Sequence, residues 1–370
     1  MKVGIITIHH TSNYGAVLQA FALSQFIRSQ GHEVEIIDYQ PQAANEFYWK
    51  AMRFLNRSGL LGMPRFDQAS FKRYWKYIKF QKFFKKYLPL SKTKFSDRNS
   101  LKQHAHQYDL VIAGSDQIWC LDNPFRGFDP SFFLDFIASD TGCVKASYAA
   151  SCGSSNTFGD RKDEISGLIN QIDHISVRDG NSLRLVKQEC GRDQVTLVLD
   201  PTFLGDYRQL IAKPRLKNKY LLLYKHGALN ERENCLIKKI ADKKDLDIVS
   251  VGSHSSLAKH NFAEADPKEW LGLFNQADHI VTNTFHGTIF SLLFKRNFTV
   301  IANPSKQNKI QDLLSRFGLD KNIFNFEADD NFDWDNCLLS EARYDELWQA
   351  FSPEIEHSKH FLMTILSSPV

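Results

Sequence analysis

Several features that mark secreted, metal-binding or membrane-spanning proteins are missing from this sequence. The six cysteines form no CxxC pair and follow no metal-ligand spacing, so we expect reduced and mostly buried thiols. The amino terminus carries no signal-peptide pattern, and no apolar run approaches the roughly 20 residues of a membrane span. The loop after the first apolar run lacks the GxGxxG pattern of dinucleotide sites. We therefore expect a cytoplasmic protein that does not cross a bilayer by itself.

The alternation of apolar runs with amphipathic segments predicts an α/β protein. One helical pattern covers Gly15–Gly31, where apolar residues recur on one face and Gly31 provides a stop. The predicted strands are Val3–Ile8, Val34–Asp38, Leu110–Ala113, Lys145–Ala149, His174–Val177, Thr196–Leu199, Tyr220–Tyr224, Asp247–Val251, His279–Thr282 and Phe298–Ile301. Such alternation is typical of parallel sheets with helices on both faces, so we expect Rossmann-like doubly wound domains.

Chain length sets the expected number of domains. With 370 residues, the chain exceeds the size at which one core usually stops growing, so two domains are expected. The stretch Pro201–Lys217 contains Pro201, Gly205 and Pro214 and is the predicted junction. We therefore assign residues 1–200 to an amino-terminal domain and residues 201–370 to a carboxyl-terminal domain. The last helix of the second domain could pack back on the first.

Positive charge is concentrated between Lys50 and Lys102. This basic segment has 15 lysines and arginines against Asp67 and Asp97, a local net charge of +13, whereas the whole chain carries +4. Aromatic residues are interleaved there: Phe71, Tyr74, Trp75, Tyr77, Phe80, Phe83, Phe84 and Tyr87. A helical insertion of this kind could attach to the inner face of an anionic membrane, or pack its aromatic side chains on the first domain. No nucleic-acid-binding motif accompanies the charge, so nucleic acid is not an expected partner.

The stretch Ala277–Phe294 is the most informative part of the sequence. An apolar strand leads into the polar turn Asn283–Thr288, which opens a helix. In a parallel sheet, the N–H groups and dipole of such a helix amino terminus attract phosphate. His286 adds a side chain of the type that exchanges protons near neutral pH. Thr284, Gly287 and Thr288 are candidate substrate-binding residues, although a capped helix with a merely hydrogen-bonded histidine is the alternative.

Other polar motifs follow predicted strands. Asp116, in Gly114-Ser115-Asp116, is placed to accept a proton or hold a sugar hydroxyl, and Gly114 permits close backbone approach. Arg178 can grip a carboxylate or phosphate with two parallel hydrogen bonds. Asp200, before Pro201, is expected to be a structural turn residue. Further candidate substrate-binding residues are Asn13, Tyr14, Gly15, Ser115, Gln117 and Lys309, the last of which could also be a solvated lysine.

Six motifs, in order, resemble those of the polysaccharide pyruvyl transferase family. They are NYGAVLQAFAL, GSDQIW, SYAASCG, ISVRD, LDPTF and TNTFHGTIFSLLF, and they span nearly the whole chain. The resemblance implies a GT-B-like architecture, with two Rossmann-like domains facing a cleft. It implies transfer of pyruvate from phosphoenolpyruvate, the donor substrate, to a sugar of a cell-surface polysaccharide or its precursor, as a ketal. A lipid-linked oligosaccharide is one possible acceptor, and no metal or other cofactor is implied.

The chemistry of such a transfer suggests a role for each candidate catalytic residue. Phosphoenolpyruvate brings close to three negative charges, which must meet cations and oriented N–H groups because unpaired buried charge is costly. The family motifs point to His286 and Arg178. We expect His286 to act as the acid or to stabilise the departing phosphate, and Arg178 to neutralise the donor. Asp116 would receive a hydroxyl proton.

Two other functions remain open from the sequence. One is a GT-B-like glycosyltransferase that uses a nucleotide sugar, because a fold does not determine a function. The other is a non-catalytic binding subunit of a polysaccharide assembly complex. The sequence also departs from the family pattern at Lys225-His226-Gly227 and at Asn283. We expect Lys225 to face either the cleft or water.

Overall fold

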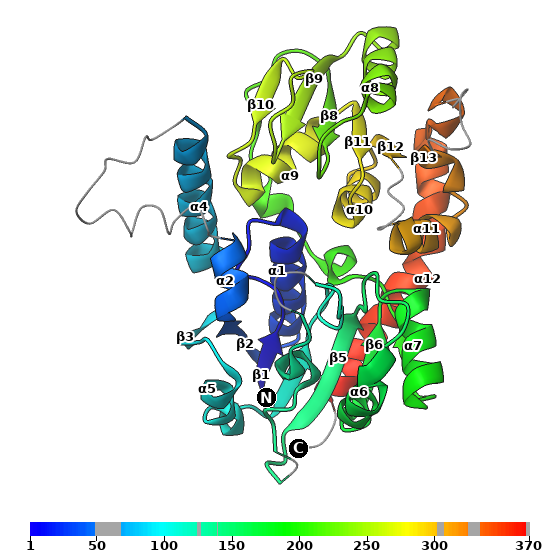
Figure 1. The fold of residues 1–370 in the computed structure, drawn as a ribbon. Coiled ribbons are helices and arrows are strands. Elements are labelled where there is room, and N and C mark those ends of the chain that lie inside the picture. The colour runs from blue at the N-terminus through cyan, green and yellow to red at the C-terminus, as the bar shows by residue number, and fades with distance from the viewer. Residues whose placement is uncertain (49–67, 124–126, 139, 302–306, 325–333, 368–370) are drawn as a thin grey trace, which may run out of the picture. The chain divides into compact units, whose positions relative to one another are not determined.

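The computed structural model describes residues 1–48, 68–123, 127–138, 140–301, 307–324 and 334–367. Contacts between residues divide the chain into two compact units. The first unit is formed by Met1–Phe66, Gln81–Gly205 and Pro353–Val370, and the second by Asp67–Phe80 and Asp206–Ser352. Helices α4 (Gln68–Tyr87) and α12 (Glu341–Leu366) contribute residues to both units (Figure 1).

The first unit contains a parallel sheet in the order β3-β2-β1-β4-β5-β6-β7. Its strands are β1 (Lys2–Ile6), β2 (Glu33–Tyr39), β3 (Leu90–Phe95), β4 (Leu110–Ala113), β5 (Val144–Ala150), β6 (His174–Val177) and β7 (Thr196–Leu197). The helices alongside are α1 (Tyr14–Ser29), α2 (Gln42–Tyr48), α5 (Arg98–Lys102), α6 (Lys162–Ile169) and α7 (Gly180–Cys190). The first six strands have the order of a Rossmann fold.

The second unit repeats this strand order in a six-stranded parallel sheet, β10-β9-β8-β11-β12-β13. Its strands are β8 (Tyr220–Tyr224), β9 (Asp247–Val251), β10 (His260–Phe262), β11 (His279–Thr282), β12 (Asn297–Ile301) and β13 (Ile323–Phe324). Its helices include α8 (Glu231–Lys243), α9 (Pro267–Gln276), α10 (Phe285–Leu293) and α11 (Gln307–Ser315). The fold class predicted from the sequence, two Rossmann-like parallel α/β domains, is confirmed.

Continuous apolar runs form the central strands of both sheets. All four residues of β4 and all five of β8 are buried, as expected for parallel strands covered on both faces. Full burial of one such aliphatic side chain stabilises the fold by about 1.5–3 kcal/mol. The bounds predicted for β4, β6, β8, β9 and β11 agree with the structure. Each of these strands could be predicted from the apolar pattern of its own residues.

The basic segment contains a strand that the sequence analysis assigned to a helical insertion. Residues 90–95 form the edge strand β3, with Leu90 paired to Ile36 and Phe95 to Tyr39. The prediction was wrong here because the run LSKTKF has three exposed central residues and little apolar signal of its own. Its extended state depends on hydrogen bonds to β2. The edge strands β10 and β13 were also missed, because they are only three and two residues long. Residues 50–67 of the basic segment lie outside the described residues.

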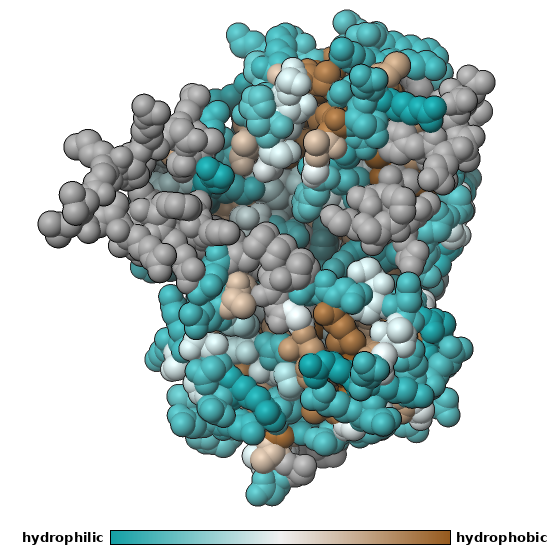
Figure 2. Space-filling model, viewed as in Figure 1, coloured by the Kyte–Doolittle hydropathy of each residue, from teal (hydrophilic) through white to brown (hydrophobic). Residues whose placement is uncertain are grey.

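One face of the molecule, the helices and the cysteines can be compared with the expectations from the sequence. Figure 2 shows a predominantly hydrophilic coloured surface on one face, with small separate hydrophobic areas. None of the helices in the described ranges combines the length and hydropathy that a membrane span requires. All six cysteines are free, and four of them, Cys120, Cys152, Cys190 and Cys337, are buried. The expectation that most of the thiols are buried is therefore confirmed.

Candidate functional site

Each sheet has a point at which its strand order reverses, and most candidate residues follow the strands at these points. In the first unit the reversal lies between β1 and β4, and in the second between β8 and β11. Ligands of open α/β sheets bind outside the carboxyl ends of the strands at such a point. Asn13 and Asp116 follow β1 and β4, and His286 follows β11. The predicted placement at strand ends is thus correct.

The turn after β11 holds the amino terminus of α10 in a defined conformation. Thr284 is the N-cap residue, and its Oγ1 accepts a hydrogen bond of 3.0 Å from the backbone N–H of Gly287. Thr288 Oγ1 donates to the Thr284 carbonyl oxygen at 3.0 Å. Both threonine side chains therefore serve the helix start itself. The N–H groups of the first turn and the positive end of the helix dipole are oriented outward from this cap.

Gly287 is required by the crowding around this cap. A Cβ atom at this position would lie 2.3 Å from Thr282 Oγ1 and 2.5 Å from Thr284 Oγ1. The two hydroxyl oxygens are themselves 3.0 Å apart and hydrogen-bonded. A side chain at residue 287 would therefore displace the threonine that caps α10. The His-Gly motif needs a glycine at this position because there is no space for a larger residue.

His286 and Lys309 both border the Phe285 ring. The His286 imidazole is buried and meets the Phe285 ring edge-on, with 5.5 Å between the ring centroids. Lys309 Nζ lies 5.7 Å from the centre of the same Phe285 ring, a cation–π distance. Lys309 belongs to the first turn of α11. The second unit thus brings together a histidine, an ammonium group and a helix amino terminus.

The two departures from the family pattern are explained by contacts within the second unit. Asn283 Oδ1 accepts from the backbone N–H of His226, and Asn283 Nδ2 donates to the His226 carbonyl oxygen, both at 2.9 Å. Asn283 therefore ties the ends of β8 and β11 together. Lys225 is buried, and its Nζ lies 2.8 Å from Glu233 Oε2. The expectation that Lys225 could face water was wrong, because the side chain is buried and Glu233, the third residue of α8, compensates its charge.

In the first unit, Arg178 joins two carboxylates that are distant in sequence. Its Nη1 donates to Asp200 Oδ2 at 2.7 Å, and its Nη2 donates to Asp116 Oδ1 at 3.1 Å. Ser115 Oγ also donates to Asp200 Oδ2, at 2.9 Å. The Arg178 and Asp200 side chains have no exposed surface, and that of Asp116 is 14% exposed. Burial alone would lower the pKa of Arg178, but the charges of Asp116, Asp200 and Asp179 raise it above its usual value.

These contacts show that Arg178 and Asp200 are partners of one another inside the first unit. The Arg178 fork, expected to grip the donor, is occupied by two carboxylates of the protein itself, so the cluster carries no excess positive charge for an anion. Asp200 caps the turn as predicted, because its Oδ1 accepts from the Thr202 N–H at 3.0 Å. It is also the buried counter-ion of Arg178. Asp116 has a positive φ of 78°, a strained conformation of a kind that clusters at functional sites.

Most of the remaining candidates from the first unit either stabilise the start of α1 or lie in the loop that follows β4. Asn13 caps α1, with its Oδ1 accepting from the Gly15 N–H at 3.0 Å. The Tyr14 ring is buried in the core. Gln117 lies beside Gly153, where an added Cβ would approach its side chain to 3.2 Å. Gly114 also permits a close approach, as predicted, because a Cβ there would lie 3.0 Å from Thr7 Cβ.

Sequence reasoning missed a buried ion pair in the first unit. His9 Nε2 and Asp38 Oδ1 are 2.9 Å apart, and both side chains are at most 2% exposed. A signal was available, because Asp38 follows Ile36 and Ile37 at the buried end of β2 and a buried carboxylate requires a partner. Within the described residues, no group of three or more histidine, cysteine or acidic side chains is arranged to hold a metal ion.

Solved structures with similar folds are found at low sequence identity. A protein from Listeria monocytogenes assigned as a UDP-N-acetylglucosamine 2-epimerase has a TM-score of 0.53 and 10% identity, with 99% of this chain and 96% of that chain covered. The UDP-GlcNAc 2-epimerase of Neisseria meningitidis has a TM-score of 0.49 and 9% identity, with both chains fully covered. A glycosyltransferase from Streptomyces sp. SF2575 has a TM-score of 0.47 and 12% identity, over 99% and 100% of the two chains. The similarity to the Listeria monocytogenes structure supports the fold assignment and nothing beyond it.

A family model gives more direct information than these structures. No match was found among curated proteins. The model described as polysaccharide pyruvyl transferase matches residues 13–305, which include every candidate residue except Lys309. The match covers well over half of the chain and confirms the resemblance found in the motifs. The chain therefore belongs to the polysaccharide pyruvyl transferase family.

Proposed function

We propose that this protein transfers pyruvate from phosphoenolpyruvate to two neighbouring hydroxyls of a sugar, forming a ketal in a cell-surface polysaccharide or its precursor. The observation that carries the proposal is the amino terminus of α10, where His286 and Lys309 border Phe285 in a chain of the pyruvyl transferase family. An ammonium group, a histidine and a helix amino terminus together suit a phosphate-bearing anion. No resident metal or cofactor is needed for this chemistry.

We assign the donor to the second unit because the charges differ between the two candidate sites. Phosphoenolpyruvate is strongly anionic, and the α10 terminus offers Lys309 and the positive helix end. In the first unit, Arg178 is already paired with Asp116 and Asp200, so that cluster has an excess of negative charge. An anion would be repelled there. The first unit is therefore assigned to the uncharged acceptor.

The reaction requires one proton donor and one proton acceptor. His286 would protonate the methylene carbon of phosphoenolpyruvate or the departing phosphate, and Asp116 would take a proton from the attacking hydroxyl. The hydroxyl oxygen bonds to the central carbon, the bond from that carbon to the phosphate oxygen breaks, and the second hydroxyl closes the ketal. The two hydroxyl protons end on the new methyl group and on the phosphate. Arg178 would act as a positioning residue that holds Asp116.

Binding of the donor to the intact protein is the direct test. Phosphoenolpyruvate at about 100 times its dissociation constant should stabilise the fold by about 2.7 kcal/mol and raise the melting temperature by about 2–4 °C. Inorganic phosphate at the same concentration is the control. Incubation with acceptor sugars should then release phosphate and increase the sugar mass by one pyruvate minus one water.

The same measurement separates the two alternative functions. A melting shift with UDP-GlcNAc or a thymidine diphosphate sugar, and none with phosphoenolpyruvate, would favour a glycosyltransferase. Binding of a saccharide without donor binding or phosphate release would favour a non-catalytic subunit of a polysaccharide assembly complex. Either result would contradict pyruvyl transfer.

We also propose that α4 attaches the protein to an anionic membrane, where a lipid-linked acceptor would be within reach. Phe71, Tyr74 and Trp75 are 55%, 36% and 43% exposed. Their rings form an exposed aromatic cluster, with centroids 5.9 Å apart for Phe71 and Trp75 and 6.4 Å for Tyr74 and Trp75. The same helix exposes Arg73, Lys82, Lys85 and Lys86, whereas Phe80, Phe83 and Phe84 are buried. The buried phenylalanines agree with the packing alternative, and the exposed aromatic and basic residues support the proposed attachment.

Replacing Phe71 and Trp75 together by serine should reduce flotation with anionic vesicles. Each basic residue near an anionic surface contributes about 1 kcal/mol, and the two rings add buried apolar area. Flotation of the wild-type protein should weaken at high salt and be absent with neutral vesicles. Met363→Ser, which removes an exposed apolar side chain of α12, is the matched control. A wild-type protein that stays with the soluble fraction on anionic vesicles at low salt would refute the attachment.

A further inference from the structure

A pocket of the second unit lies where the strands β8 and β9 begin. Its lining includes residues 215–218 and the first residues of both strands, and its volume is about 300 Å³, the lower end of the range for small-ligand sites. The proposed donor site lies at the other end of the same sheet. A strand rises about 3.3 Å per residue, so the length of β8 places roughly 13 Å between the two. The pocket is therefore separate from the α10 amino terminus.

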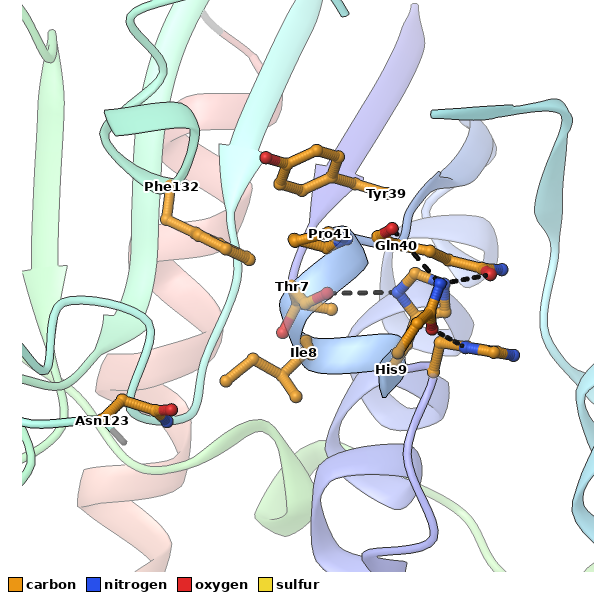
Figure 3. Close-up of a pocket in the computed structure, with 11 residues that line it drawn as sticks. Thr7, Ile8, His9, Tyr39, Gln40, Pro41, Asn123 and Phe132 are labelled. Atoms are coloured by element: carbon orange, nitrogen blue, oxygen red, sulfur yellow. Dashed lines mark hydrogen bonds between the residues drawn. The ribbon is translucent and has the colours of Figure 1, made fainter. Parts of the chain in front are cut away.

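The pocket shown in Figure 3, at the carboxyl ends of β1 and β2, is much smaller. Its volume is about 30 Å³, which is room for about two water molecules. Its polar side chains already bond to protein groups: Asn45 Nδ2 donates to Gln40 Oε1 at 3.3 Å, and His9 Nδ1 lies 3.1 Å from the Thr7 carbonyl oxygen. Of these two pockets, the one in the second unit has room for a sugar.

The wall formed by residues 215–218 is held in place by α9. The Ala212 N–H donates to the Lys268 carbonyl oxygen of this helix at 3.2 Å. The Ala212 carbonyl oxygen is so close to the helix that a Cβ atom at Gly272 would lie 1.7 Å from it, so a glycine is needed there. The chain is therefore anchored just before it reaches the pocket, and protein contacts set the position of the wall.

Asp247, the first residue of β9, brings to the pocket a carboxylate that is already paired. Lys259 Nζ lies 2.9 Å from each Asp247 carboxylate oxygen, and Asn218 Nδ2 donates to Asp247 Oδ2 at 2.8 Å. The hydrogen bonds from Lys259 and Asn218 hold the pKa of Asp247 below its usual value, so the carboxylate is ionised near neutral pH. Because Lys259 balances its charge, Asp247 does not compensate the cations of the wall.

Arg215 and Lys217 supply positive charge that has no protein counter-ion. Both side chains are exposed, and neither forms an ion pair or a side-chain hydrogen bond with any residue that the structure describes. The segment Lys213–Lys219 contains four basic residues and no acidic one. The Arg215 fork can bind a carboxylate through two parallel hydrogen bonds. By contrast, the Arg178 fork is occupied by carboxylates of the protein.

We propose that this pocket binds the carboxylate of an acidic sugar unit of the polysaccharide, the ligand being a repeat that already bears the pyruvate ketal. The two cations select an anion, the Arg215 fork matches a carboxylate, and the partly exposed Leu216 contacts an apolar face of the sugar. The inference rests on the proposed function, which leaves the carboxylate of the donor on the product. A finished repeat bound here would hold the polymer on the protein between successive transfers.

The test uses the full chain and matched acidic and neutral probes. The acidic probes are methyl glucuronide and the pyruvate ketal of methyl galactoside, and the neutral probes are methyl glucoside and methyl galactoside. Saturation-transfer NMR reports weak binding without requiring turnover. Exposed ion pairs contribute little each, so the wild type should bind the acidic probes with dissociation constants of about 1 mM. The neutral probes should bind at least about tenfold more weakly.

Two double variants that remove the same charge separate the pocket from general attraction of anions. The pocket variant combines Arg215→Gln with Lys217→Gln, and the control variant combines Lys213→Gln with Lys219→Gln, exposed residues of the same segment outside the lining. The pocket variant should bind the acidic probes at least about tenfold more weakly, and the control variant no more than about threefold, because screened charges outside the pocket act weakly. Equal weakening in both variants, equal binding of acidic and neutral probes, or no binding of either acidic probe would overturn the pocket assignment.

Calorimetry with phosphoenolpyruvate distinguishes failure of this proposal from failure of the proposed function. If the pocket variant binds phosphoenolpyruvate as the wild type does but loses the acidic sugars, both proposals are supported. If it loses the acidic sugars and phosphoenolpyruvate binds neither protein, the pocket assignment stands and pyruvyl transfer does not. Loss of phosphoenolpyruvate binding in the pocket variant would make the pocket a site for the donor, and undiminished binding of the acidic sugars would exclude Arg215 and Lys217. Either result would overturn the pocket assignment.

Discussion

Replacement of Arg178 by alanine is expected to lower the free energy of unfolding of the first unit by about 3–5 kcal/mol. The guanidinium bridges Asp200 at 2.7 Å and Asp116 at 3.1 Å, and its side chain has no exposed surface. Its removal leaves two carboxylates facing one another without a cation. Arg178→Lys should recover only part of the loss, because a single ammonium group cannot bridge both carboxylates as the planar fork does. Urea unfolding followed by circular dichroism measures the effect.

An exposed ion pair of the same unit provides the control for this measurement. Arg161 Nη1 lies 2.8 Å from Glu164 Oε2, and both side chains are about half exposed, at 53% and 50%. Arg161→Ala should change stability by no more than about 1 kcal/mol, because exposed pairs contribute little. Adding Asp200→Asn to Arg178→Ala should restore part of the stability by removing one unpaired charge. An Arg178→Ala protein as stable as the wild type, with weaker phosphoenolpyruvate binding, would instead support the donor-binding role first predicted.

Replacement of His286 by alanine is expected to reduce turnover at least about 100-fold, the lower range for loss of one acid–base group. The fold should survive, because the α10 cap is made by Thr284 and Gly287 rather than by the imidazole. Phosphate release from phosphoenolpyruvate, measured in the presence of an acceptor sugar, gives the rate. The circular dichroism spectrum should be unchanged.

His260 is the matched control in the same unit. It is exposed and is the first residue of the edge strand β10. It therefore lies at the amino ends of the strands, whereas the turn that carries His286 follows the carboxyl end of β11. His260→Ala should keep turnover within a few-fold of the wild type, since surface substitutions away from a site have small effects. Near-normal turnover in His286→Ala would remove this histidine from the proposed mechanism.

Local sequence patterns were sufficient to predict the elements that position both candidate sites. The strands β4, β8 and β11 consist of short buried apolar runs, and each is followed by a polar turn. The start of α10 was predictable because Thr284 is a favourable N-cap residue immediately before an apolar helical pattern. The motif order also identified the family, which the family model then confirmed over residues 13–305.

Edge strands and ion pairs could not be predicted in this way because each depends on a distant partner. The strand β3 is extended through hydrogen bonds to β2, about fifty residues earlier, and its own residues carry a weak signal. Arg178 looks like a free anion-binding group in the sequence, and only the sheet brings Asp116 and Asp200 to it. Lys225 likewise meets Glu233 only once α8 has packed beside β8.

The sequence by itself determined the α/β class, the central strands, the turns at their carboxyl ends and the family, because those features are encoded in short-range periodicity, caps and motif order. The tertiary structure decided which charges are already compensated, as at Arg178, Lys225 and the His9–Asp38 pair. Coulomb energy and burial depend on distances in space, and parallel sheets bring together residues that are tens of positions apart along the chain.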